Sequence, residues 1–169
     1  MTRIDDEAAF HDFVVARSAA LLRTAYLLTG DAHLAEDLVQ TALFKTAKSW
    51  RRIRGNPEAY CRRILHNENV SRWRRARHVE ESALDETLRT PVAAEPDTDL
   101  SVTLEQALAH LTERQRSLLV LRFYEDLTEV QTAHVLGISP GTVKSSTRQA
   151  LARLRQIAPH LGELVEVRP

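Results

Sequence analysis

A set of polar and cationic side chains between residues 142 and 149 has the chemistry needed to contact DNA. Arginine and lysine donate hydrogen bonds to phosphates and guanine, glutamine pairs with adenine, and hydroxyl groups reach either kind of site. Helical spacing would turn six of these residues outward: Thr142, Lys144, Ser145, Ser146, Arg148 and Gln149. The opposite side would pack inward through Val143, Thr147, Ala150, Leu151 and Leu154. The pattern predicts a helix that lies in the major groove of DNA.

Two short helices joined by a tight turn must position that face. Thr128 is predicted to cap the first helix, because Thr128 and Gln131 have the spacing of a capping box. Gly137 is predicted to end this helix in the left-handed conformation. Ser139 followed by Pro140 has the pattern that begins a helix. Together these residues predict a helix-turn-helix.

A plain helical hairpin with a solvated polar face is the alternative interpretation of this segment, since charge on an exposed helix usually serves solubility. Two observations favour a DNA-binding face. Ala133 is small at the position where the two helices would cross, and no Asp or Glu occurs from residue 130 to residue 162. A surface without acids can approach phosphates without repulsion.

A second set of DNA-binding candidates lies nearer the middle of the chain. They are Arg51, Arg52, Arg54 and Asn56 in a loop, and Arg63, Asn67, Ser71 and Arg74 along one face of the helix that follows. Guanidinium groups neutralise phosphates, amides hydrogen-bond to bases, and Trp73 lies where it could stack on a base. Trp50 and Tyr60 are interpreted as core residues. The set predicts a site for unpaired bases, with RNA or an acidic protein as alternative partners.

The charges are segregated along the chain although the formal net charge is zero. Residues 45–78 contain eleven Lys or Arg against two Asp or Glu, whereas residues 79–100 contain seven Asp or Glu against one Arg. A basic segment therefore stands beside an acidic one. The basic segment favours a nucleic-acid partner, which the net charge alone would argue against.

Helical periodicity and an aromatic content of 5% predict an all-α protein built from two small helical domains. The first is expected at residues 7–79, with helices over residues 10–30, 31–50 and 57–77 and with Asp31 and Asn56 as N-caps. The second, at residues 101–158, contains the helix-turn-helix. Residues 80–100 are acidic, contain Pro91 and Pro96 and lack an apolar period, which predicts a flexible acidic linker.

Several classes of function find no support in the sequence. No apolar run is long enough to span a membrane and no signal peptide is visible, so we expect a cytoplasmic protein. A single Cys61 excludes a disulfide within the chain, and the seven histidines lack the spacing of metal ligands. An enzyme that acts on nucleic acid would need converging carboxylates, but Glu36 and Asp37 are adjacent and face differently on a helix. We expect no catalytic residue, no metal and no cofactor.

Three segments occur in a fixed order along the chain. DAHLAEDLVQTAL covers residues 31–43, PEAYCRRILHNENVSRWRR covers residues 57–75, and LTERQRSLLVLRFYEDLTEVQTAHVLGISPGTVKS covers residues 111–145. They resemble the polymerase-binding helix, the promoter-melting helix and the minus-thirty-five-reading domain of bacterial RNA polymerase sigma factors of the extracytoplasmic-function class. The resemblance extends over nearly the whole chain.

The resemblance implies a promoter-directing subunit that leaves catalysis to the polymerase. Its partners would be core RNA polymerase and promoter DNA, with an anti-sigma protein as a further candidate. The positions that match the family's polymerase-binding face are Glu36, Asp37, Gln40 and Thr41. Asn67 and Ser71 match positions that line the minus-ten site, residues 51–56 match the segment that captures a flipped base, and Arg148 and Gln149 match the minus-thirty-five-reading helix.

Two positions depart from the usual pattern of the family. Thr41 stands where many relatives have an acid, and Ser146 stands where a long side chain is common. An autonomous helix-turn-helix regulator, which binds DNA without the polymerase, is the alternative function.

Overall fold

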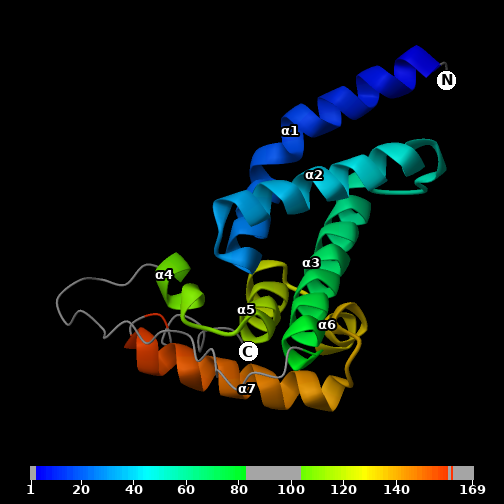
Figure 1. Cartoon of the computed structure of the whole chain (residues 1–169). Coiled ribbons are helices and arrows are strands. Elements are labelled where there is room, and N and C mark those ends of the chain that lie inside the picture. The colour runs from blue at the N-terminus through cyan, green and yellow to red at the C-terminus, as the bar shows by residue number, and fades with distance from the viewer. Residues whose placement is uncertain (1–2, 83–103, 160, 162–169) are drawn as a thin grey trace. The chain divides into compact units, whose positions relative to one another are not determined.

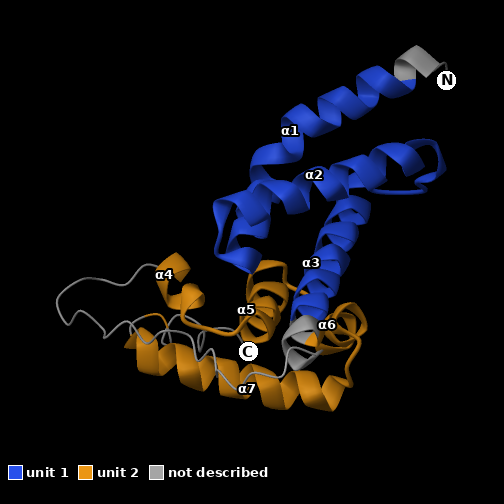
Figure 2. Cartoon of the chain, in the orientation of Figure 1, with its two compact units in different colours: residues 1–77 blue, residues 78–169 orange. Residues whose placement is uncertain are grey.

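The computed structural model describes residues 3–82, 104–159 and 161, and the regular elements within these ranges are helices (Figure 1). The chain divides into two compact units, unit 1 at Met1–Arg77 and unit 2 at His78–Pro169 (Figure 2). The prediction of an all-α protein with two helical domains is confirmed. Residues 83–100, which make up most of the predicted linker, lie outside the described residues.

In unit 1, α1 (Arg3–Thr29) and α2 (Ala32–Ser49) pack against each other across a tight turn. Gly30 makes the turn with a φ of 69°, in the left-handed region that favours glycine. Asp31 caps α2 as predicted, because its carboxylate accepts a hydrogen bond from the Leu34 N–H at 2.9 Å. The turn and the cap therefore set where α2 begins.

The third helix of unit 1, α3 (Pro57–Ser82), follows a short 3-10 turn, η1 (Trp50–Arg52), and a loop. Asn56 acts at the start of α3 as predicted, because its side-chain oxygen accepts a hydrogen bond from the Glu58 N–H at 2.8 Å. The core of unit 1 takes small and branched side chains from all three helices: Leu21, Ala25, Leu28, Ala35, Leu38, Ala42, Cys61 and Leu65.

The expected end of the third helix near Arg77 was wrong, because α3 continues to Ser82. The expectation rested on the change from basic to acidic residues after His78. A change in the sign of the charge does not end a helix, since Arg and Glu are both good helix formers. No Gly or Pro occurs between Ala76 and Ser82. The first three residues of the predicted linker, 80–82, are consequently helical.

Unit 2 contains α4 (Leu104–Ala109), α5 (Glu113–Leu119), a π turn η2 (Val120–Tyr124), α6 (Glu129–Leu136) and α7 (Pro140–Ile157). The long helix α7 packs on both α5 and α6. The buried apolar residues come from every one of these helices and include Leu108, Leu118, Leu121, Leu136, Val143, Ala150 and Leu154.

A buried arginine connects α4 to α5. Arg116 is 6% exposed, and its Nε donates a hydrogen bond to the Leu108 carbonyl at 3.0 Å. One of its terminal nitrogens donates to the Leu111 carbonyl at 3.3 Å. Carbonyls at and beyond a helix C-terminus lack partners within the helix, so the guanidinium satisfies groups that would otherwise be buried without a hydrogen bond.

The helix-turn-helix forms as predicted. Thr128 and Gln131 make a reciprocal capping box at the start of α6, and Gly137 ends α6 with φ 63° and ψ 42°. Ser139 caps α7 and Pro140 is its first residue. Ala133, at the predicted crossing point, is 5% exposed. The segment therefore holds α7 at a fixed start against α6.

Among the described helices, none combines the length and the apolar composition that crossing a bilayer requires.

Two glycines of the helix-turn-helix should respond oppositely to alanine. Gly137→Ala is expected to lower the free energy of unfolding by about 1 kcal/mol, because its left-handed φ penalises a Cβ. Gly141→Ala is the matched control, because a Cβ there would meet its nearest atom, the Ser139 hydroxyl, at 3.9 Å. Gly141→Ala should raise the free energy of unfolding by about 0.4–1 kcal/mol. Urea unfolding of the full chain measures both changes, and a stabilising Gly137→Ala would contradict the assignment.

Candidate nucleic-acid and protein interfaces

The predicted DNA-reading face of α7 is open to solvent. Lys144, Ser145, Arg148 and Gln149 are exposed, whereas Thr142 and Ser146 are half-buried. Val143, Ala150 and Leu154 are buried on the other side of the helix, while Thr147 and Leu151 are half-buried. The structure thus leaves the longer side chains of this set accessible, with Lys144 at the flank of the face, and covers Thr142 and Ser146 in part.

The hydroxyl groups at the start of α7 already serve the helix. Ser139 Oγ accepts a hydrogen bond from the Thr142 N–H at 3.1 Å and lies 2.8 Å from the Thr142 hydroxyl. Ser145 Oγ donates to the Thr142 carbonyl at 3.2 Å. Within the described part of the chain, the side chains of Lys144, Arg148 and Gln149 make no hydrogen bond or ion pair. These three long side chains are therefore ready to contact a ligand.

The loop at residues 51–56 carries cations in different environments. Arg52 and Arg54 are exposed, and Gly55 has a φ of 102° that a residue with a Cβ rarely adopts. Arg51 is also exposed, but its Nε donates to Asp6 Oδ2 of α1 at 2.7 Å. Asn56 is exposed and its side-chain oxygen is engaged in the cap of α3.

The predicted polar stripe of α3 lies along one accessible side of the helix. Arg63, Asn67 and Arg74 are exposed, and Ser71 is half-buried. The Arg63 guanidinium lies 5.3 Å from the centre of the Tyr60 ring. The Arg74 guanidinium lies 5.7 Å from the centre of the Trp73 ring. The stripe therefore combines cations, an amide and aromatic surface, the combination predicted to hold unpaired bases.

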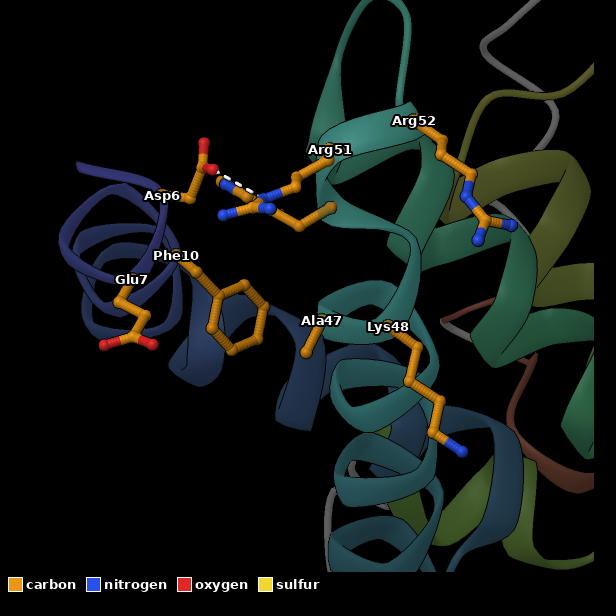
Figure 3. A pocket seen from close by; sticks show the side chains of 8 residues that line it. Asp6, Glu7, Phe10, Ala47, Lys48, Arg51 and Arg52 are labelled. Carbon is orange, nitrogen blue, oxygen red and sulfur yellow. Dashed lines mark hydrogen bonds and ion pairs between the residues drawn. The ribbon is translucent and has the colours of Figure 1, made fainter. Parts of the chain in front are cut away.

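A hollow of about 480 Å³ lies between the first turns of α1 and the end of α2 (Figure 3). Its wall combines two aromatic rings with charges of both signs: Asp6, Glu7, Phe10, Ala47, Lys48, Trp50, Arg51 and Arg52. Figure 3 shows Arg51 turned toward Asp6, while Arg52 extends away from it. The Trp50 ring packs against Phe10 and Phe13, at centroid distances of 5.1 and 5.3 Å, but Trp50 is half-buried at the edge of the hollow and does not lie within the buried core.

The predicted polymerase-binding positions share an exposed side of α2. Glu36, Asp37 and Gln40 are exposed, and Thr41 is half-buried. The helical pattern includes Phe44 only as an apolar position, but its side chain is 61% exposed. It lies one turn beyond Gln40 and two turns beyond Asp37. Leu34, 36% exposed, lies one turn before Asp37. The available signal was their spacing from Asp37, three residues for Leu34 and seven for Phe44.

Potential metal ligands and the one cysteine were the remaining candidates for chemistry within the described residues. No three His, Cys, Asp or Glu side chains in these ranges form a group that could hold a metal ion. Burial raises the pKa of the Cys61 thiol by desolvation, against a lowering effect of its hydrogen bond with Thr46. Cys61 is consequently a core side chain and not an activated nucleophile.

Comparisons with known proteins match both units. The family model described as sigma-70 region 2 matches residues 13–79, and the one described as sigma-70, region 4 matches residues 107–156. An RNA polymerase sigma-E factor of Streptomyces coelicolor is 40% identical over 151 residues, which cover 87% of this chain and 84% of that protein. The ECF RNA polymerase sigma factor SigL of Mycobacterium tuberculosis is 31% identical over 160 residues, 86% of each chain.

A solved structure is also similar. It is the sigma factor RpoE from Bartonella quintana, crystallised in complex with the anti-sigma factor NepR. The sequence identity is 28% and the TM-score is 0.61, over 88% of this chain and 96% of that one.

Two substitutions on α7 should separate base contacts from phosphate contacts. Arg148→Ala is expected to relax sequence preference at one position by about 1–3 kcal/mol, because a guanidinium discriminates between base edges. Lys144→Ala should weaken binding to all sequences alike. It should also reduce the slope of the logarithm of the binding constant against the logarithm of salt concentration by about one, the contribution of one phosphate contact. Selection from random duplexes and salt titration of the protein–DNA complex measure the two effects.

Arg153→Ala is the control for both, since Arg153 is an exposed arginine of α7 outside the predicted set. If Arg153→Ala changed the selected sequences as much as Arg148→Ala, the assigned reading face would be wrong.

Proposed function

Because this chain belongs to the extracytoplasmic-function class of the sigma-70 family, we propose that it docks on the polymerase through α2 and reads its promoter with α3, the preceding loop and α7. As a sigma factor, it binds core RNA polymerase and directs initiation at promoters by recognising and melting promoter DNA. The observation that carries this function is the presence of both sigma regions in one chain, at residues 13–79 and 107–156.

The alternative, an autonomous regulator, is not favoured. A helix-turn-helix alone would fit either function, but an autonomous regulator has no need of the region 2 match in unit 1. Sigma factors are in general non-enzymatic DNA-recognition subunits. We extend this to the present chain, which would leave all chemistry to the polymerase and would act in the cytoplasm, where the polymerase and the chromosome are.

The docking surface proposed on α2 is an acidic strip flanked by apolar side chains. Leu34, Asp37, Thr41 and Phe44 follow one another at intervals of three and four residues, so they line one side of the helix. A partner helix with matching apolar residues could bury Leu34 and Phe44, which are 36% and 61% exposed. Basic residues of that partner would pair with Glu36 and Asp37. This chemistry fits a helical element of core polymerase.

Promoter melting is proposed to follow from binding unpaired bases. Asn67 and Ser71 would contact bases of the minus-ten element, and residues 51–56 would hold a base that has left the helix. A surface that binds the open form and not the duplex shifts the equilibrium toward melted DNA by its differential affinity. The α7 face would hold the minus-thirty-five element as duplex, through Arg148 and Gln149.

An anti-sigma protein is a further proposed partner. The support is the solved sigma factor of similar structure, which is bound to an anti-sigma factor. The exposed Phe44 and Leu34 offer apolar area that a competitor of the polymerase could cover.

Transcription by a reconstituted enzyme tests the function directly. The full chain is combined with core RNA polymerase and fragmented genomic DNA, and the bound fragments and transcript starts are sequenced. We expect initiation from a set of sites that share two elements. A chain that binds duplex DNA strongly without core polymerase, and supports no initiation with it, would favour the autonomous regulator.

A charge reversal tests the docking surface. Asp37→Arg is expected to reduce the amount of core polymerase retained in a pull-down by at least tenfold, because it places like charges together in the interface. Phe44→Ala should also weaken retention, through the loss of buried apolar area. Asp12→Arg is the matched control, since Asp12 is an exposed acid of α1 outside the proposed surface. Equal retention of wild type and Asp37→Arg would refute the assignment.

A further inference from the structure

Helix α1 contacts the first end of the loop at residues 51–56. Arg51 Nε donates to Asp6 Oδ2 at 2.7 Å, and the two side chains are 63% and 12% exposed. The neighbouring Trp50 packs its ring against Phe10 and Phe13 at 5.1 and 5.3 Å between centroids. The start of the loop is therefore held by one ion pair and one aromatic cluster, both on α1.

The same helix also contacts the residues just after the loop. Glu58, in the first turn of α3, accepts a hydrogen bond from Arg62 at 3.0 Å and forms an ion pair with Arg17 of α1 at 3.1 Å. Arg62 donates in turn to the Thr24 hydroxyl of α1 at 3.3 Å. The Glu58 N–H is itself bonded to the Asn56 side chain, so this network reaches the last residue of the loop.

These contacts form a single stripe on α1. The stripe consists of Asp6, Phe10, Phe13, Arg17 and Thr24. The intervals of four, three, four and seven residues place them on one side of the helix. One helical face therefore contacts the chain on both sides of the loop, and Figure 3 shows the contact of Asp6 with Arg51 on the first side.

We propose that this stripe sets the conformation of the loop, and that Asp6 is a positioning residue that orients Arg51 toward promoter DNA. The proposal rests on the proposed role of residues 51–56 in holding an unpaired base. The hydrogen bond to Asp6 uses Nε, and the high exposure of Arg51 leaves its terminal nitrogens available to a phosphate or a base. A guanidinium already held in place loses less conformational freedom when it binds.

The proposal predicts a combination of effects that simple destabilisation would not produce. Asp6→Asn removes a negative charge near the DNA, so the affinity for a strand with a wrong base should stay equal or rise. It also releases Arg51, so the preference for the correct base should fall. A purely structural role of Asp6 would instead lower the affinity for every strand by the same factor.

The first test uses polymerase carrying the full chain, after its promoter has been identified by sequencing. Dissociation constants are measured for the non-template minus-ten strand and for the same strand with one base replaced. With Asp6→Asn, we expect the ratio of the two constants to fall by about twofold to fivefold, the range of a single exposed ion pair. Asp12→Asn is the control, because Asp12 is an exposed acid of the same helix that makes no ion pair with described residues.

A double-mutant cycle identifies the residue through which Asp6 acts. If Asp6 acts through Arg51, Asp6→Asn should change the ratio no further in an Arg51→Ala background. If Asp6→Asn lowered the ratio in the Arg51→Ala background as much as it does in the wild type, the proposal would be overturned.

Hydrogen exchange of the free full chain tests, without polymerase or DNA, whether the stripe on α1 holds the loop. Amides of residues 51–56 should exchange about twofold to fivefold faster in Asp6→Asn than in wild type, and unchanged in Asp12→Asn. Unchanged exchange in Asp6→Asn would overturn the proposal even where wild type supports initiation. Absence of initiation by wild type would count against the proposed function, while the exchange result would still decide whether α1 holds the loop.

Discussion

The helices that present the candidate surfaces must each satisfy the N–H groups of their first turn, which have no partner within the helix. Asp31, Asn56 and Ser139 do so for α2, α3 and α7, by accepting backbone hydrogen bonds at 2.9, 2.8 and 3.1 Å. A cap fixes the residue at which a helix begins. Each further residue advances the helix by about 100°, so the cap sets where along the chain this periodicity begins, while the buried apolar side decides which residues face outward. Both the docking face and the reading faces depend on these caps.

The zero net charge of the chain conceals two uses of its cations. Some cations hold unit 1 together: Lys45 pairs with Glu68 at 2.5 Å, and Arg62 pairs with Glu58 at 3.0 Å. Others, such as Arg52 and Arg54 in the loop, point to solvent. Because Glu58 and Glu68, the two acids of the basic segment, are both ion-paired, the outward surface of this segment keeps a positive potential. A sequence average cannot separate these two uses.

In helix α2, one feature could be predicted from the sequence pattern and another could not. Its start was predictable from Gly30 and Asp31, because a left-handed glycine and an N-cap act within a few residues. The exposure of Phe44 was not, since an apolar residue on an amphipathic helix is more often buried. Phe44 is exposed because α1 packs on the side of α2 that carries Leu38 and Ala42, and Phe44 lies outside that side.

The sequence by itself determined the all-helical class, the start of α2, the start of α3 and the helix-turn-helix, because each follows from interactions between residues three or four apart. The tertiary structure alone decided which cations face outward and what holds the loop at residues 51–56. Arg51 and Asp6 are separated by 45 residues, and Arg62 and Thr24 by 38. Such pairs depend on the angle and depth at which whole helices pack, which no local spacing encodes.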